Sequence, residues 1–358
     1  MTSHWITEPH SCDVLVVGAG PAGISAAEQL ALQGARVTLL ERHVEPGKKV
    51  CGGGLTRSSW ELLGIDPKQP AYAAETWQKM EVRSPLGKVV VSGVGPQMMT
   101  FERELWTAER LEHLQAIGVR LVLGERFLRL DPSSRNGAIT SQGKRIFGFL
   151  VGADGANSRV RKQIGLLRGC SVRGWQILLR GRDSFGRCLQ GNRPVVFFNP
   201  ALFKSGYGWA FPYRNTLRVG CGASSGVMGA GGLKSSFNKW LSKMRIVPTE
   251  GSIRAGSIGC DYQGHRFGNL FLAGDAAGLA SPLTGEGIYQ ALISGREVAR
   301  EILDDGYRSA IIARLAFRHR RTHDILANSV LSFVLYNISP FLLRFDPVQA
   351  ATWERYVF

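Results

Sequence analysis

Three glycines at fixed spacing are the first residues of this chain whose pattern points to chemistry. Gly18, Gly20 and Gly23 follow a short apolar run and open a stretch whose apolar residues have helical spacing. Such a turn lets a pyrophosphate approach bare backbone at a helix N-terminus, where N–H groups and the helix dipole favour negative charge. Glu41 ends the next apolar run and could accept hydrogen bonds from ribose hydroxyls. The pattern predicts a dinucleotide site, with a purely structural glycine turn as the alternative.

A second glycine-rich segment, FLAGDAAGLASPLTGEGI (271–288), points to the same kind of chemistry. Asp275 follows an apolar run and could bind the hydroxyl groups of a ribityl chain or another polyol. Gly285 and Gly287 precede a long helical pattern and would present a helix N-terminus to a ligand. We therefore expect a second cradle that is built mainly from backbone.

A third segment, VCGGGLTRSSW (50–60), combines Cys51 with three consecutive glycines. Glycine is poor in helix and strand interiors, so this run suggests that something approaches the backbone closely. Cys51 is either part of a reactive centre or a small buried apolar residue, the commonest fate of a free cysteine. Farther along, Tyr207, Trp209 and Phe211 alternate and would share one face of a strand. Such a row forms either core or the wall of an apolar tunnel.

The elements that must position these residues are of two kinds. Residues 13–42 predict strand, glycine turn, helix and strand, residues 101–118 an amphipathic helix, and residues 269–303 a strand, loop and long helix. Residues 146–165 predict a strand that runs into a loop and a helix, and residues 71–100 and 166–259 are rich in short strands. We therefore predict an α/β fold, in which a Rossmann-like domain carries an inserted antiparallel-sheet substrate domain and a helical C-terminal tail. The nucleotide domain is placed at 11–70, 101–165 and 260–310, the substrate domain at 71–100 and 166–259, and the C-terminal segment at 311–358.

The composition is that of a globular protein with a strong basic surplus. The chain has 358 residues, of which 44% are hydrophobic and 20% charged, and a formal net charge of +16. Five arginines and no acid lie between Tyr307 and His323, and eight bases and one acid between Arg159 and Arg187. These clusters are either solvated faces or sites for phosphorylated ligands or an anionic membrane. No zinc-finger, RNP-like or basic-zipper pattern is visible, so no nucleic-acid partner is expected.

The cysteines and the two ends of the chain bear on its location. The six cysteines include no C-x-x-C pair, so neither a metal site nor a disulfide framework is expected, and a reducing, cytoplasmic compartment fits better. The first twelve residues lack the pattern of a secretory signal. Residues 325–343 carry no charge and approach the length of a bilayer span, but asparagines, serines and Pro340 lower their apolarity. They predict a helix that packs on the body or lies peripherally at a membrane surface.

Together these motifs resemble a known family. Residues 18–41, VGADGANSRVR (151–161) and GDAAGLASPLTGEGI (274–288) are similar to the three FAD fingerprints of p-hydroxybenzoate-hydroxylase-like flavoproteins. KKVCGGGLT (48–56) and GYGWAFP (206–212) resemble the cysteine–glycine segment and the Tyr-x-Trp-x-Phe-Pro motif of the geranylgeranyl reductase family. The resemblance covers about residues 12–310.

The resemblance implies FAD as the cofactor and gives individual residues a role. Cys51 would lie between flavin and substrate, with the neighbouring glycines admitting the flavin against bare backbone, and Cys51, Tyr207 and Trp209 are the candidate catalytic residues. The implied FAD contacts are Gly18, Gly20, Ala22, Gly23, Glu41, Cys51, Gly52, Gly54, Arg103, Phe127, Asp275, Gly287 and Ile288.

The implied reaction is the hydrogenation of isolated C=C bonds in a prenyl chain carried by a lipid, a diphosphate, a chlorophyll or a quinone. An isolated alkene accepts hydride poorly, so reduced flavin and a proton donor must be held against it in a dry site. The proton donor (Cys51, Tyr207 or a flavin-bound water) and the electron donor (NADPH or a ferredoxin-like protein) stay open. An FAD-dependent monooxygenase of an aromatic or quinone is the alternative, and a membrane-associated FAD electron carrier is a further one.

Overall fold

The computed structural model describes residues 11–69, 71–72, 74–92, 95–167, 169, 171–180, 189, 192–248, 252–328 and 331. Cys170, Cys188 and most of the uncharged stretch 325–343 lie outside the described residues. The expectations for them stay predictions.

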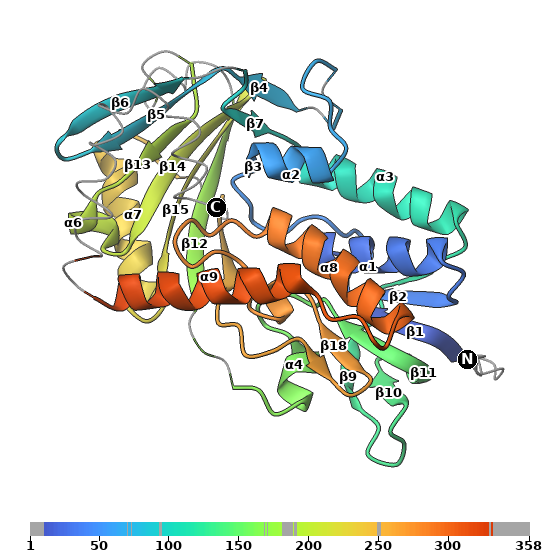
Figure 1. Cartoon of the computed structure of the whole chain (residues 1–358). Helices are drawn as coiled ribbons and strands as arrows, with labels where there is room; N and C mark the ends of the chain where they lie inside the picture. Colours follow the sequence, from blue (N-terminus) through green and yellow to red (C-terminus); the bar gives the residue numbers. More distant parts are fainter. Residues whose placement is uncertain are drawn as a thin grey trace.

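The first sheet is built around the glycine turn and has eight strands among the described residues (Figure 1). Its central strands β18, β11, β1, β2 and β8 run parallel in that order. Strand β17 joins antiparallel at one edge, and β10 and β9 extend antiparallel from β11. The strands are β1 (Ser11–Val17), β2 (Val37–Glu41), β8 (Arg120–Leu123), β9 (Phe127–Leu130), β10 (Gly137–Thr140), β11 (Gly143–Gly152), β17 (Arg266–Phe267) and β18 (Leu270–Leu272).

The continuous apolar run of β1 is explained by burial on both faces of this sheet. Val16 pairs with Val151 on one side and Leu39 on the other, and all three are fully buried. Helices α1 (Pro21–Leu32) and α8 (Ile288–Leu303) pack against each other, and α1 also contacts α3 (Arg103–Ala116). The glycine turn therefore delivers α1 directly from the central strand.

The second sheet has seven strands among the described residues, in the order β16, β12, β15, β14, β13, β5, β6. It is antiparallel except for the β13–β5 pair, which is parallel: the β5–β6 hairpin comes from a distant part of the chain and adds to the sheet beside β13, with β6 at the edge. The strands are β5 (Lys79–Ser84), β6 (Gly87–Ser92), β12 (Ser171–Arg180), β13 (Val195–Phe197), β14 (Gly206–Tyr213), β15 (Thr216–Ser224) and β16 (Ile253–Gly259).

One face of the second sheet is closed by α7 (Ala230–Lys243), with the short α6 (Pro200–Phe203) beside it. Leu233, Phe237 and Trp240 of α7 form a core with the strands. A second, smaller apolar cluster of this sheet includes Met80, Val196 and Phe211. The second cluster supplies part of the cavity wall described below.

A small third sheet joins the two larger ones. It consists of β3 (Gly54–Leu55), β7 (Met98–Thr100) and β4 (Glu75–Trp77), all antiparallel. Helix α2 (Arg57–Leu62) follows β3, so the cysteine–glycine segment leads directly into this sheet. Two further short elements flank the glycine-rich loops: α4 (Arg159–Gln163) and the 3-10 turn η2 (Gly274–Ala276).

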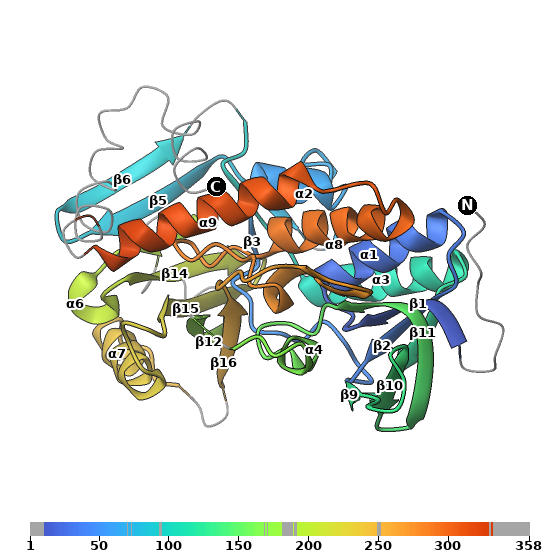
Figure 2. The same ribbon diagram turned by 60° about the horizontal axis from the view of Figure 1, so that its bottom comes forward.

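The last described helix, α9 (Ala310–Ala327), crosses the molecule in front of both sheets (Figures 1 and 2). Ser309 caps it: its Oγ accepts from the Ile312 N–H at 3.1 Å and donates to Glu297 Oε2 of α8 at 2.6 Å. Within the described ranges, no helix has both the length and the apolarity that crossing a bilayer requires.

The predicted α/β architecture is confirmed in its Rossmann-like part, its largely antiparallel second sheet and its C-terminal helix. The exact domain boundaries stay a prediction.

Candidate active site

One cavity of about 1410 Å³ is lined by residues of both large sheets. Its wall includes the glycine turn after β1, the segment that carries Cys51, strands β14 and β16, and the loop that precedes α8. All of the predicted cofactor and catalytic residues except Gly23 line this cavity. Gly23 packs against the Gly18 carbonyl oxygen instead, so its role as a cofactor contact stays a prediction. The fold therefore brings together segments that lie more than two hundred residues apart in the chain.

At one part of the cavity, the N-terminus of α1 faces a basic side chain. Gly20 is the N-cap of α1, and none of the described side chains caps the N–H groups of its first turn. The side chain nearest to the place where a Cβ of Gly20 would lie is Arg103, whose Nη2 is 3.8 Å away. The Arg103 Nε is buried without a hydrogen-bond partner among the described residues. Unpaired N–H groups and a guanidinium together suit an anionic ligand.

Close packing around the turn requires glycine at two of its three glycine positions. Gly18 has φ +107°, and a Cβ there would lie 2.5 Å from the Ala153 carbonyl oxygen. A Cβ on Gly23 would lie 1.9 Å from the Gly18 carbonyl oxygen, so α1 could not pack so close to the turn. Gly20 has no such neighbour, which leaves free space in front of the helix.

Glu41 and Phe127 line the neighbouring part of the cavity. Glu41 accepts hydrogen bonds from the Ala19 N–H at 2.9 Å and from the His43 N–H at 3.0 Å, one on each carboxylate oxygen. These bonds fix the carboxylate at the end of β2, and each oxygen keeps a further lone pair. Phe127 is buried at the start of β9, so a ligand would meet it mainly through its backbone.

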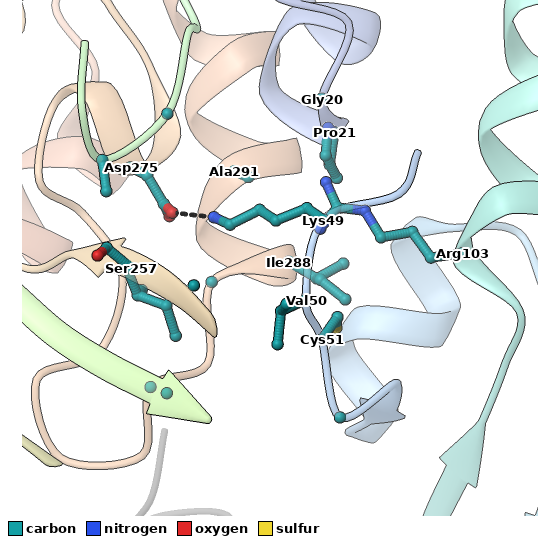
Figure 3. A pocket seen from close by; sticks show the side chains of 18 of the residues that line it. Gly20, Pro21, Lys49, Val50, Cys51, Arg103, Ser257, Asp275, Ile288 and Ala291 are labelled. Atoms are coloured by element: carbon teal, nitrogen blue, oxygen red, sulfur yellow. Dashed lines mark hydrogen bonds and ion pairs between the residues drawn. The ribbon is translucent and has the colours of Figure 1, made fainter. Parts of the chain in front are cut away.

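Figure 3 shows Asp275 facing Lys49 across the cavity. The Lys49 ammonium lies 2.5 Å from Asp275 Oδ2, and the carboxylate side chain is only 10% exposed. Gly287 is the N-cap of α8, and none of the described side chains caps this helix either. Ile288 begins the helix and also lines the cavity. Two helix N-termini thus open onto one space.

This donor set fits FAD. The two uncapped helix ends and Arg103 suit the anionic pyrophosphate, and Glu41 and Asp275 are acceptors for ribose and ribityl hydroxyls. The free space before Gly20 allows close approach to the backbone.

The cysteine–glycine segment is shaped by the second and third sheets. A Cβ on Gly53, whose φ is +70°, would lie 1.8 Å from Tyr213 Oη, and one on Gly54 would lie 2.1 Å from Met98 Cε. A Cβ on Gly52 would lie 3.2 Å from Trp209 Nε1. These glycines therefore make room for side chains that pack on the segment, which is a reason that the sequence did not reveal. Their contact with the flavin stays a prediction.

Arg218 of β15 fixes the backbone of this segment through hydrogen bonds and an ion pair. Its Nη1 donates to Tyr213 Oη at 2.9 Å and to the Cys51 carbonyl oxygen at 3.4 Å, and its Nη2 pairs with Glu102 at 2.7 Å. The guanidinium also lies over the Tyr213 ring at 4.1 Å from the ring centroid. The Gly53 N–H in turn donates to Cys51 Sγ at 3.3 Å. The backbone around Cys51 is thus fixed by a buried cation.

The aromatic row of β14 forms an apolar wall. Tyr207, Trp209 and Phe211 all line the cavity, with ring centroids 6.0 and 6.5 Å apart along the row. The Tyr207 hydroxyl donates to the Thr284 carbonyl oxygen, and burial raises the pKa of Tyr207, so the phenol is neutral and its proton is engaged. The catalytic roles of Cys51, Tyr207 and Trp209 stay predictions.

Sequence reasoning missed three charged residues of the site. Lys49 pairs with Asp275, Arg218 fixes the Cys51 backbone, and Glu286 accepts hydrogen bonds from Thr56 at 2.8 Å and Ser59 at 2.6 Å. Arg218 carried a signal, because it is the one charged residue in the apolar strand TLRVGCGAS. Lys49 and Glu286 could be found only from the meeting of distant loops.

Comparisons with known proteins agree with this geometry. A family model described as "FAD binding domain" matches residues 11–80. A digeranylgeranylglycerophospholipid reductase of Methanopyrus kandleri is 29% identical over 325 residues, which cover 83% of each chain. A menaquinone reductase of Mycobacterium tuberculosis is 30% identical over 322 residues, which cover 82% of this chain and 77% of the relative. The chain belongs to the geranylgeranyl reductase family of FAD-dependent oxidoreductases.

Solved structures show that the fold of this geranylgeranyl reductase family member is shared more widely. A geranylgeranyl bacteriochlorophyll reductase-like protein from Thermoplasma acidophilum aligns with a TM-score of 0.73 at 18% identity, covering 97% of this chain and 99% of its own. A probable FAD-dependent monooxygenase from Pseudomonas aeruginosa aligns with a TM-score of 0.66 at 18% identity, covering 94% of this chain and 100% of its own. The fold is thus common to reductases and monooxygenases. The predicted family and the predicted FAD cofactor are confirmed.

Proposed function

We propose that this protein is an FAD-dependent reductase that hydrogenates isolated C=C bonds of a prenyl chain. The observation that carries the proposal is the continuity of the cavity. The cradle of two helix N-termini opens directly onto a wall of apolar side chains: Met80, Met98, Val196, Phe198, Trp209 and Phe211. A prenyl chain is apolar along its whole length and fits such a wall, because contact with it removes apolar surface from water. The related reductases of prenyl-bearing lipids and diphosphates support the proposal.

The chain's own residues would bind, orient and keep the site dry. Bound FAD, once reduced, supplies the hydride that an isolated alkene requires. The aromatic row would hold the prenyl chain in one orientation, and Arg218 would keep the Cys51 backbone fixed beside it. The apolar wall excludes water, which strengthens every polar interaction inside.

Product mass tests this proposal. The purified protein is loaded with FAD, reduced with dithionite so that the natural electron donor does not matter, and incubated with prenyl diphosphates, prenyl ether lipids and a prenylated quinone. A reductase yields products that have gained two hydrogens per double bond. A product that has gained oxygen in air identifies the monooxygenase alternative and overturns the proposal, as does the recovery of every substrate unchanged.

We also propose that the basic face of α9 holds the protein peripherally at an anionic membrane. Arg314, Arg318, Arg320 and Arg321 are exposed on this helix, and Phe317 among them is 53% exposed. Ile325 lies on the same helix and is 40% exposed. Arginines interleaved with exposed apolar side chains match lipid headgroups above an acyl boundary. This location would bring a membrane-borne prenyl substrate to the enzyme.

Vesicle flotation tests this location without reference to catalysis. Wild-type protein should float with vesicles that contain phosphatidylserine or another anionic lipid, less so in high salt, and not with neutral vesicles. Replacing Arg314 and Arg321 by serine should weaken binding by roughly 10- to 30-fold, because each base near the surface contributes about 1 kcal/mol. The matched control replaces the exposed Arg129 and Arg135, which removes the same charge from the β9–β10 edge. Equal loss in both double variants would contradict a role specific to α9.

A further inference from the structure

The ion pair between Lys49 and Asp275 crosses the cofactor cavity (Figure 3). Lys49 belongs to the segment that precedes Cys51, and Asp275 follows β18 in the first sheet. Their Nζ and Oδ2 atoms are 2.5 Å apart, with side chains 37% and 10% exposed. The carboxylate therefore has little contact with water, although a polar ligand must bind in front of it.

The other acidic side chains of the same cavity have partners of their own. Glu45 pairs with Lys48, and Glu125 forms a buried two-point pair with Arg145. Asp154 accepts the N–H groups of Arg159 and Val160 at the start of α4. Among the described residues, the cation that forms an ion pair with Asp275 is Lys49. Its negative charge is thus balanced by a single flexible side chain.

A carboxylate beside an anionic cofactor needs such a balance. The pyrophosphate of FAD is negatively charged, and two like charges in a site that excludes water repel each other strongly. A buried charge that loses its partner costs much more than the pair itself contributes. We propose that Lys49 neutralises Asp275, so that this carboxylate can accept hydrogen bonds from FAD without repelling it. Lys49 is then a positioning residue that acts through Asp275.

Titration of the FAD-free protein with FAD, followed by flavin fluorescence, tests the proposal independently of any prenyl substrate. Lys49→Met should weaken FAD binding by about 10-fold or more, because the Asp275 carboxylate, which is only 10% exposed, is left without its cation. Lys144 is a matched control, because it pairs with Asp131 at 2.7 Å with similar exposure, 46% and 8%, but neither residue lines this cavity. Lys144→Met should stay within about threefold of wild type.

The Asp275→Asn background shows through which group Lys49 acts. With the negative charge already removed, adding Lys49→Met should change FAD affinity by less than about threefold, which is the signature of coupling in a double-mutant cycle. A loss of tenfold or more in both backgrounds would mean that Lys49 binds the cofactor directly and would overturn the proposal. An FAD affinity of the Lys49→Met variant equal to that of the wild type would also overturn the proposal.

Lys49→Arg separates lost charge from lost folding. This variant keeps the positive charge and should bind FAD within about threefold of wild type. If it binds as weakly as Lys49→Met while both variants unfold at the wild-type temperature, charge is not the property that matters and the proposal fails. Failure of the prenyl-reductase assay with normal FAD affinities would affect the proposed function alone.

Discussion

At the scale of single residues, the site depends on positions where only glycine leaves room for the neighbouring groups. Gly53 lies under Tyr213 and Arg218, which anchor the Cys51 backbone to the second sheet. Any side chain at position 53 would push these groups apart, and the Tyr213 hydroxyl that donates to the Phe101 carbonyl oxygen would lose its place. The glycine therefore lets the segment that carries Cys51 pack directly against Tyr213 of β14 and Arg218 of β15.

Gly53→Ala should be much more damaging than Gly64→Ala. Both residues have nearly the same left-handed backbone, with φ +70° and +69°, but a Cβ at position 64 has no atom within 4 Å. Gly64→Ala should cost about 1–2 kcal/mol of the free energy of unfolding from backbone strain alone. Gly53→Ala should cost roughly a further 1–3 kcal/mol from overpacking. Denaturant unfolding measures both variants, and equal losses would mean that the segment relaxes around the new methyl group.

At the scale of elements, α9 is attached to the body by polar contacts at both ends and a buried histidine between them. Ser309 caps it against Glu297, and His323 bonds to the Cys260 carbonyl oxygen at 2.7 Å. His319 lies between these points and is only 6% exposed. Burial, with a smaller contribution from the nearby His323, lowers the pKa of His319 to about 4. The helix is therefore docked with a neutral imidazole inside.

The attachment of α9 should weaken as the pH falls from about 6.5 towards 4. In this window the unfolded chain binds a proton on His319 and the folded chain does not, so the free energy of unfolding decreases with decreasing pH. The contribution of one such group has a slope of up to about 1.4 kcal/mol per pH unit. Unfolding measured at several pH values should show a shallower slope for His319→Leu than for wild type. Identical slopes would show that the pKa of His319 is the same in the folded and the unfolded protein.

At the scale of the whole molecule, the cofactor cavity lies where the two large sheets meet. Its lining comes from the β1 turn and the α8 N-terminus of the first sheet and from β14 and β16 of the second. A ligand that fills this cavity would contact both halves, so it would stabilise their association as well as each half. The binding free energy is then added to the free energy of unfolding of the entire chain.

FAD should therefore stabilise both sheets in a single transition. At a free FAD concentration one hundred times Kd, the gain is about 2.7 kcal/mol. Calorimetry of the protein with and without FAD should show one unfolding transition that moves to higher temperature. Two transitions, of which FAD moves only one, would mean that the halves unfold independently and that the cofactor contacts only one of them.

Much of the fold could be read from the sequence because its signals are local. The run from Val14 to Val17, the glycine turn and Glu41 are set by strand burial, backbone conformation and helix polarity within one βαβ unit. The alternation of Tyr207, Trp209 and Phe211 likewise fixed one face of β14, and these residues do line the cavity. The family and the FAD cofactor followed from such short motifs.

What only the tertiary structure decided are the contacts between segments far apart in the chain. Nothing near Gly53 in sequence reveals Tyr213 and Arg218 above it, and nothing near Lys49 reveals Asp275. The parallel pairing of β5 with β13 also joins strands that lie far apart in the chain. Local patterns fix backbone conformation and which face is buried, whereas charge balance and close packing are properties of the groups that folding brings together.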